Sequence, residues 1–238
     1  MTTLLYHTDA YQRTCTATVT GHSSEGNGII LDQTIAYCTS GGQPHDTGTI
    51  AAAGQEYTLV EVKKTPDGVV HILAGESRPA LGSSVIVTID WERRYRLMRT
   101  HTAMHLLCGV VFRDYGALVT GGNMDIDEGR LDFEISDFTP ELAQRIVDAV
   151  NVEVAANRPL AVKILPRAEA FAIPDLIRTK INLLPDGIAE IRTVNIVGLD
   201  LQADGGTHVA ATGEVGTVTL LKTRSKGATN KRIIVGLA

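Results

Sequence analysis

The sequence lacks the hydrophobic segments that would direct a chain into a membrane or out of the cell. No run of about 18 apolar residues occurs, and the N-terminal stretch MTTLLYHTDAYQRT has no basic region followed by an apolar one. There are only three cysteines, Cys15, Cys38 and Cys108, which are widely spaced and form no CxxC pattern. Neither a disulfide framework nor a thiolate zinc knuckle is indicated, so we expect a soluble cytoplasmic protein in a reducing compartment.

Aromatic residues make up only 5% of the chain, and positive charge is not in excess. The core must therefore be mainly Val, Ile, Leu and Ala, and 23 glycines with 8 prolines favour strands and tight turns over helix bundles. Because the net charge is -5, nucleic acid could bind only at a local basic patch. Two stretches supply such residues, Arg93 to Arg99 and a C-terminal group of Lys222, Arg224, Lys226, Lys231 and Arg232.

Residues 1–90 carry the pattern of a small antiparallel β-barrel. Short runs rich in Val, Ile and Thr are separated by Gly, Pro, Asp or Ser, with almost no helical period. Seven runs are expected to form strands: CTATVT (15–20), GIIL (28–31), TIAYC (34–38), TGTIAAA (47–53), EYTLVEVKK (56–64), VVHILA (69–74) and SVIVTID (84–90). Pro66-Asp67-Gly68 is a strong hairpin signal between two of them.

Residues 91–238 are expected to form an α+β domain. A helix of about 25 residues should begin after Asp90, which suits its N-cap, with Glu92 near the positive end of the helix dipole. A second helix is expected to start at Thr139-Pro140 and to run to about Asn157. Strands are expected at 117–126, 129–135, 159–165, 189–198, 216–225 and 230–238, and an irregular or short helical region from Pro166 to Pro185.

The long helix places His101 and His105 four residues apart, on one face with Leu97 and Cys108. Two imidazoles so placed can share a metal ion if further ligands come from elsewhere. The segment DLQADGGTHV, 200–209, can supply Asp204 and His208, because Gly205-Gly206 admits backbone angles that other residues resist. The four residues would make a site suited to zinc.

The alternative interpretation of these residues is structural. His101 and His105 would then only line a packed helix face, and His208 would cap a turn. A zinc-protease motif HExxH is disfavoured in either case, because Thr102 follows His101 where the general base Glu would stand.

A glycine-rich stretch runs from Thr39 to Gly48 in the N-terminal domain. It has no GK[ST], so it is not a P-loop, and no helix pattern follows it, so it is not a dinucleotide fingerprint. It is either a wide hairpin loop or a loop that reaches into the pocket of the second domain and contacts the substrate there. In the second case Gln43 and Asp46 would make polar contacts and Gly41 and Gly42 would allow close backbone approach.

Two motifs together resemble a known family. The stretch RRYRLMRTHTAMHLL, Arg93 to Leu107, and DLQADGGTHV, Asp200 to Val209, resemble the editing domain of alanyl-tRNA synthetase and of its free-standing, AlaX-type trans-editing relatives. Threonyl-tRNA synthetase carries a more distant version. SGGQPHDTG, 40–48, is similar to the glycine-rich motif of the N-terminal barrel in the longer free-standing forms. The segment SKGATNKRI, 225–233, also resembles sequences of this family. The resemblance implies a two-layer α/β editing domain of the type common to the threonyl and alanyl enzymes.

The resemblance further implies hydrolysis of the ester that joins a wrong amino acid, chiefly serine and also glycine, to the tRNA for alanine. Family zinc ligands fall on His101, His105 and His208, one ion per chain, with Asp204 at a position that is Cys in many members. Because Asp is a harder donor than Cys, another divalent metal is also possible. No ATP-binding core, nucleotide cofactor or membrane partner is expected.

The site residues are predicted in three groups. The catalytic group is His101, His105, Gln202 and Thr120, with Gln202, Thr120 and Thr102 as candidates to read a substrate hydroxyl. The contacts to substrate or tRNA are Gly41, Gly42, Gln43, Asp46, Arg93, Arg94, Arg99, Lys222, Arg224 and Lys226. Two rival functions remain open: a metal-dependent hydrolase of a small ester or amide, and a non-catalytic RNA-binding module.

Overall fold

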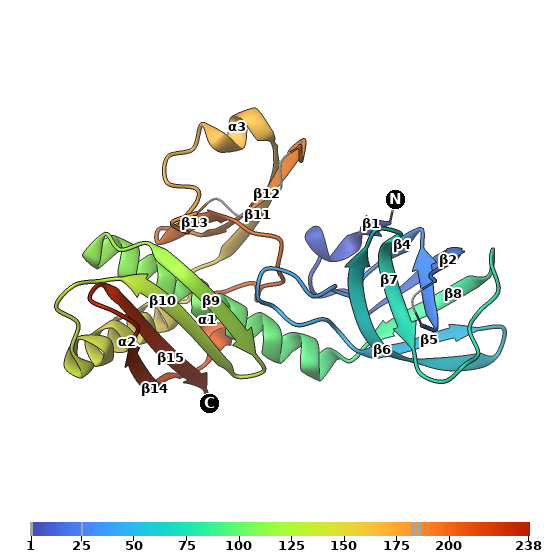
Figure 1. The fold of residues 1–238 in the computed structure, drawn as a ribbon, viewed down its shortest axis with the longest axis horizontal. Coiled ribbons are helices and arrows are strands. Elements are labelled where there is room, and N and C mark those ends of the chain that lie inside the picture. Colours follow the sequence, from blue (N-terminus) through green and yellow to red (C-terminus); the bar gives the residue numbers. More distant parts are fainter. Residues whose placement is uncertain (1, 25, 182–183, 185–186) are drawn as a thin grey trace. The chain divides into compact units, whose positions relative to one another are not determined.

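The computed structural model describes residues 2–24, 26–181, 184 and 187–238. Contacts divide the chain into two compact units, Met1–Tyr95 and Arg96–Ala238, with the division inside helix α1 (Trp91–Tyr115) (Figure 1). The sequence suggested a boundary at residue 90. The first turn of α1 belongs to the first unit because the Arg94 guanidinium is buried there, where it donates to Asp46 and to the carbonyl oxygens of Ala10 and Ile35.

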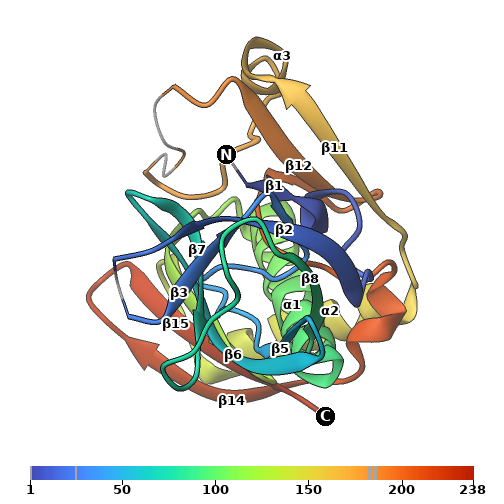
Figure 2. The ribbon, with the colours of Figure 1, turned by 90° about the vertical axis from the view of Figure 1, so that its right-hand side faces the viewer.

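The first unit is a closed antiparallel barrel with strand order β2-β3-β7-β6-β5-β8, as predicted (Figure 2). The strands are β2 (Thr14–His22), β3 (Gly28–Leu31), β5 (Gly48–Ala52), β6 (Gln55–Thr65), β7 (Gly68–Leu73) and β8 (Ser84–Ile89). Two short strands, β1 (Thr3–Leu4) and β4 (Gln33–Thr34), pair in parallel next to the 3-10 helix η1 (Leu5–His7).

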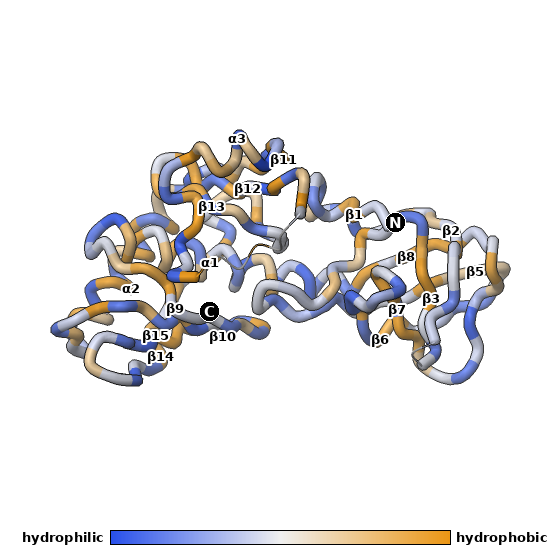
Figure 3. The backbone as a smooth tube through the Cα atoms, turned by 45° about the horizontal axis from the view of Figure 1, so that its top comes forward, coloured by the Kyte–Doolittle hydropathy of each residue, from blue (hydrophilic) through white to orange (hydrophobic). Residues whose placement is uncertain are grey.

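Alternation of apolar and polar residues along the strands produces the barrel core. In β2, Cys15, Ala17 and Val19 are buried while the threonines between them are not, because successive side chains of a strand point to opposite faces. The apolar stretch of β3 is visible in Figure 3, where this strand is coloured as hydrophobic. The predicted hairpin is confirmed, since Thr65 at the end of β6 pairs with Gly68 at the start of β7.

The strand predicted over TIAYC is wrong after its first residue. Only Thr34 lies in a strand, and Ile35 to Cys38 are buried without strand pairing. Side chains from other parts of the sequence hydrogen-bond to the backbone of this segment instead. The Tyr37 amide donates to the Asp46 carboxylate at 2.6 Å, and the Ile35 carbonyl oxygen accepts from Arg94 at 2.6 Å. These contacts explain why an apolar, strand-like sequence forms a buried loop.

Helix α1 is the central element of the second unit. The Asp90 carboxylate caps it by accepting the Arg93 amide at 3.1 Å, and Gly116 ends it with a φ of 64°. Every residue from Thr100 to Val111 is buried. A helix buried all round must have other elements packed on each of its sides.

A four-stranded antiparallel sheet, ordered β14-β15-β10-β9, packs one face against the helices of the second unit (Figure 1). Its strands are β9 (Val119–Asp125), β10 (Glu128–Glu134), β14 (Val218–Ser225) and β15 (Asn230–Leu237). Helix α2 (Pro140–Ala155) lies against β14, and Thr139 caps it by accepting the Leu142 amide at 3.1 Å. These elements confirm the predicted α+β organisation.

A three-stranded antiparallel sheet, ordered β11-β12-β13, completes the unit. It consists of β11 (Leu160–Pro166), β12 (Glu190–Ile196) and β13 (Asp200–Ala203), and the 3-10 helix η2 (Thr212–Val215) follows later in the chain. The region predicted to be irregular contains the short helix α3 (Arg167–Phe171), while residues 182, 183 and 185 lie outside the described residues. The sequence did not predict β13.

All three cysteines are free and buried. Among the described residues, no helix combines the length and the apolar character needed to cross a membrane.

Candidate metal centre

Helix α1 presents two candidate ligands on one face. His101 and His105 lie one turn apart, with ring centroids separated by 5.1 Å. Each is only 7% exposed, because neighbouring elements surround this part of the helix. Cys108, one turn further along, is buried, and burial raises the pKa of its thiol, so it stays protonated near neutral pH.

The segment after β13 brings the other two candidates to the same point. Nε2 of His208 lies 3.0 Å from the Asp204 carboxylate, and the His208 ring lies 4.4 Å from His101 and 4.7 Å from His105, between centroids. The Gly206 amide donates to Asp204 at 2.7 Å and fixes the turn. Neither Gly205 nor Gly206 has a positive φ, so the expected role of unusual backbone angles there is wrong.

The geometry of these four residues fits a metal ion. One ligand atom from each lies within 4.8 Å of all the others. The Asp204 carboxylate is 3.6 Å from Nε2 of His101 and 3.9 Å from Nε2 of His105, in addition to the 3.0 Å to His208. Atoms bound about 2.0–2.1 Å from a tetrahedral zinc ion lie about 3.3 Å apart, which these separations bracket.

The protonation of the cluster also suits a cation. Burial lowers the pKa of His101 well below its ordinary value and the pKa of His208 to about 4, so both rings are neutral near neutral pH. Burial opposes charge on His105 too, but the carboxylates of Asp204 and Asp200 outweigh it and raise its pKa. Burial opposes the charge of Asp204, yet the surrounding histidines lower its pKa well below the ordinary value. The donor set therefore contains an anionic carboxylate.

Thr102 supports His208 rather than facing a substrate. Its hydroxyl lies 3.1 Å from Nδ1 of His208 and accepts the Val209 amide at 3.3 Å. The residue is fully buried. The prediction that Thr102 reads a substrate hydroxyl is therefore wrong, and its position orients the ring whose other nitrogen faces Asp204.

Arg192 on β12 is a site residue that sequence reasoning missed. Its Nη1 donates to the Asp204 carbonyl oxygen at 2.9 Å and lies 3.7 Å from the Asp204 carboxylate. The side chain is only 6% exposed. A charged residue inside the apolar run EIRTVNIV was the available signal, because charged groups are buried only where they are paired.

Asp200 and Gln202 on β13 lie beside the histidines. The Gln202 amide donates to the Asp200 carboxylate, which is 3.9 Å from Nδ1 of His105. Gln202 is half-buried, while the Asp200 side chain is 1% exposed. Sequence reasoning noted Asp200 only as part of a motif and assigned it no role.

Comparisons with known proteins agree with this architecture. The family model for tRNA synthetases class II (A) matches residues 8–93, and the model for the threonyl and alanyl tRNA synthetase second additional domain matches residues 191–234. The chain is 36% identical to the alanyl-tRNA editing protein AlaX-M of Saccharolobus solfataricus, over 98% of both chains. It is 34% identical to AlaX-M of Methanosarcina barkeri, again over 98% of both.

The chain belongs to the AlaX-M family of alanyl-tRNA editing proteins. The family resemblance predicted from the two histidine motifs is thus confirmed. The alanine–tRNA ligase of Ignicoccus hospitalis is 38% identical over 92% of this chain, but that match covers only 24% of the ligase.

In this AlaX-M family member the glycine-rich loop is a compact structural unit. Ser40 and Gln43 exchange backbone hydrogen bonds around Gly41 and Gly42, whose φ values of 57° and 86° favour glycine. The two glycines form the tip of the turn, and Gln43 is buried. Asp46 is fully buried and binds Arg94 and the Tyr37 amide.

Burial contradicts three of the predicted contacts, because Gln43, Asp46 and Arg94 are all at 0% exposure. Arg94 and Asp46 are both at 0% exposure, and each is hydrogen-bonded within the first unit. A guanidinium in that position is not available to a phosphate, and the paired carboxylate is not available to a substrate. These residues join the loop to the first turn of α1 instead.

The other predicted cations are more exposed than Arg94. Arg93 donates to the His45 carbonyl oxygen at 3.0 Å, and Arg99 donates to the carbonyl oxygens of Val215 and Ala238. Exposed cations on and after β14 are Lys222, Arg224 and Lys226. Thr120 is exposed on β9 and donates to Asn230 of β15 at 3.1 Å, so its described contact lies within the four-stranded sheet.

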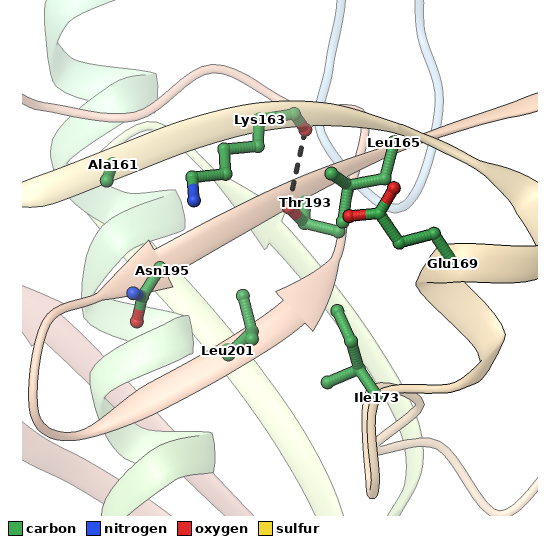
Figure 4. A pocket seen from close by; sticks show the side chains of 8 residues that line it. All are labelled: Ala161, Lys163, Leu165, Glu169, Ile173, Thr193, Asn195 and Leu201. Atoms are coloured by element: carbon green, nitrogen blue, oxygen red, sulfur yellow. Dashed lines mark hydrogen bonds between the residues drawn. The ribbon is translucent and has the colours of Figure 1, made fainter.

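A cavity of about 190 Å³ lies on the three-stranded sheet but does not contain the ligands. Figure 4 shows its lining, which includes Thr193 and Asn195 of β12 and Leu201 of β13. Arg192, which contacts Asp204, precedes Thr193 and so points to the opposite face of the sheet. The cavity and the candidate metal centre therefore lie on different faces.

Proposed function

We propose that the protein is a trans-editing hydrolase that removes a wrong amino acid from the tRNA for alanine. The observation that carries the proposal is the buried cluster of His101, His105, Asp204 and His208, in a chain similar over its whole length to proteins named for alanyl-tRNA editing. We propose serine as the principal amino acid removed and glycine as a second. Such a reaction serves translation fidelity in the cytoplasm and needs no ATP.

The four cluster residues would hold one zinc ion, and Asp204 would also admit other divalent metals. When bound, zinc supplies a Lewis acid beside the reacting carbonyl group and a site at which water becomes more acidic. The chain itself supplies four largely buried donors. Thr102 fixes the His208 ring, and Arg192 holds the Asp204 backbone so that the carboxylate faces the three imidazoles.

The hydrolysis adds the oxygen of water to the ester carbonyl carbon and breaks the bond between that carbon and the ribose oxygen. One proton of water ends on the released ribose hydroxyl, and the other leaves with the amino acid. Asp204 is engaged by the histidines, and Asp200 is engaged by Arg178 and Gln202. We therefore propose that the neighbouring hydroxyl of the substrate ribose, and not a protein side chain, relays the proton from water to the leaving ribose oxygen.

Selection against alanine requires a group that reads the hydroxyl of serine. A site built to hydrogen-bond a hydroxyl can reject the analogue that lacks it by roughly 10⁴ to 10⁵. Gln202 is half-buried on the sheet face that carries Arg192, and we propose its amide oxygen for this role, since the amide nitrogen donates to Asp200. Thr120 stays a second prediction, which replacement by Ala would test.

The tRNA backbone would meet exposed cations of the second unit. Lys222, Arg224 and Lys226 are exposed on and after β14, and we propose them as phosphate contacts. Phosphate contacts position a nucleic acid without reading its sequence, so their loss should weaken binding and reduce its dependence on salt.

The decisive experiment compares Ser-, Gly- and Ala-charged tRNA for alanine, each incubated with the protein with and without a chelator. We expect loss of the seryl ester, slower loss of the glycyl ester, retention of the alanyl ester and inhibition by the chelator. Equal hydrolysis of all three, or of none, would contradict the proposal. Cleavage of small seryl esters at the same rate, without inhibition by uncharged tRNA, would point to a small-ester hydrolase instead.

A further inference from the structure

One nitrogen of His105 has no hydrogen-bond partner in the part of the chain that the structure describes. Nδ1 of this residue is buried, while Nε2 faces the Asp204 carboxylate. A buried imidazole N–H without an acceptor is costly, so such an atom normally has a specific partner close by. The nearest described carboxylate on that side belongs to Asp200, with Oδ2 at 3.9 Å from Nδ1.

Asp200 is held in place from two directions. Nε of Arg178 donates to Oδ1 at 3.2 Å, and the Gln202 amide donates to Oδ2. The Arg178 guanidinium in turn lies 3.8 Å from the ring centroid of Phe112, near the end of α1. The Asp200 carboxylate is thus a buried anion with a paired cation, and its side chain is only 1% exposed.

Helix α1 is shaped to let this carboxylate approach. Gly109 lies one turn after His105, and a Cβ atom added there would be 2.9 Å from Cβ of Asp200 and 3.1 Å from Cγ of Leu199. A side chain at this position would push β13 away from the helix. The absence of a Cβ at Gly109 therefore permits Asp200 to lie beside His105, with Oδ2 at 3.9 Å from Nδ1.

We propose that Asp200 is a positioning residue for His105, with Arg178 and Gln202 holding its carboxylate. The carboxylate accepts a hydrogen bond from the Nδ1–H group of His105 and so favours the tautomer in which Nε2 is free to bind the metal. A carboxylate behind a ligating histidine orients the ring and makes it a better donor. The inference rests on the metal centre of the proposed function and deepens it.

The test measures zinc affinity without any tRNA, by competition with a chromophoric chelator. Asp200→Asn keeps the size of the side chain but removes the charge, and we expect affinity to fall by about 10- to 100-fold. The matched control is Asp132→Asn, which removes another buried, Arg-paired carboxylate, on β10. We expect the control to change zinc affinity by less than about twofold, since its partners are Arg232 and Lys226 rather than a ligand.

A second measurement does not depend on the folding of a variant. In zinc-loaded wild-type protein with ¹⁵N-labelled histidine, we expect the His105 spectrum to show a proton on Nδ1 and a metal-bound Nε2. A proton on Nε2 would overturn the role of Asp200, and so would wild-type zinc affinity in Asp200→Asn. Failure of the wild type to bind zinc would overturn the metal centre itself, and with it the role of Asp200. Failure of the Asp200 role alone would leave zinc binding by the wild type intact, so the two results can be told apart.

Discussion

At the scale of single residues, we expect Asp204 to determine which metal the candidate site prefers. It is the anionic member of the cluster, and its carboxylate lies within 3.9 Å of all three imidazoles. We expect Asp204→Ala to weaken zinc binding by more than about 100-fold. That is the largest effect expected when a residue that only hydrogen-bonds to a metal ligand is replaced. Asp204→Cys should retain zinc and favour it more strongly over manganese, because thiolate is the softer donor.

Metal competition titrations on the three proteins check both expectations. Asp204→Ala tests the need for an anionic ligand, and Asp204→Cys tests the preference that its chemistry confers. If Asp204→Ala bound zinc as tightly as the wild type, Asp204 would be a neighbour of the metal and not a ligand.

His71, inside the barrel, should make the first unit sensitive to acid. It is fully buried, with Nε2 2.8 Å from the Thr34 hydroxyl, and burial lowers its pKa to about 4. Because the unfolded chain takes up this proton near pH 6.5 and the folded chain only near pH 4, stability is complete above about 6.5 and is lost as the pH falls. The loss amounts to about 3 kcal/mol by pH 4.

Urea unfolding followed by Trp91 fluorescence measures this loss. Trp91 is the single tryptophan and packs against the barrel core, so it reports on the first unit. His71→Gln keeps a hydrogen-bonding side chain that does not titrate, and we expect it to flatten the pH dependence between 6.5 and 4. An unchanged slope in His71→Gln would assign the acid sensitivity to other groups.

At the scale of elements, helix α1 is held by two ion pairs of different kinds. Arg94 and Asp46 are at 0% exposure, whereas Arg96 and Asp127 are at 41% and 27%. Asp46→Asn leaves a buried guanidinium without its counter-charge, and we expect a loss of about 3–5 kcal/mol. Asp127→Asn is the matched control, expected to cost at most about 1 kcal/mol because water screens the pair.

Thermal and urea unfolding of the two variants check the contrast. Asn also tolerates the positive φ of 57° at position 127, so backbone strain does not confuse the control. Comparable losses in both variants would show that burial of the Arg94 pair adds nothing to stability.

Local signals explain which elements could be predicted from the sequence. Asp90 and Gly116 mark the ends of α1, and Thr139 marks the start of α2, because capping groups act within a few residues. The buried loop at Ile35–Cys38 could not be predicted, since its backbone partners, Asp46 and Arg94, depend on the folded chain. Strand β13 forms because it pairs with β12, and the sequence of its four residues alone does not indicate this pairing.

The same distinction applies to the candidate site. The four clustered residues were predictable because helical spacing and a recognisable motif place them. The positions of Thr102, Arg192 and Asp200 around the cluster were not, since each depends on how α1, β12 and β13 pack. Sequence patterns identify ligand chemistry, but they do not distinguish a ligand's support from a substrate contact.

At the scale of the whole molecule, the four candidate ligands all belong to the unit Arg96–Ala238. A metal that binds only the folded state stabilises it by mass action, by about 2.7 kcal/mol when its concentration is 100 times the dissociation constant. Removal of the metal should therefore destabilise the second unit by about this amount. The first unit contains none of the four ligands and should not respond.

Two signals separate the units in one unfolding experiment. Trp91 fluorescence follows the barrel, and helical circular dichroism follows the second unit, which contains α2, α3 and most of α1. We expect a chelator to shift the circular dichroism transition to lower urea and to leave the fluorescence transition in place. His101→Ala, which lacks a ligand, should show no further shift on chelation. Equal shifts of both signals would mean that the two units unfold as one, and no shift in either would mean that the cluster holds no stabilising metal.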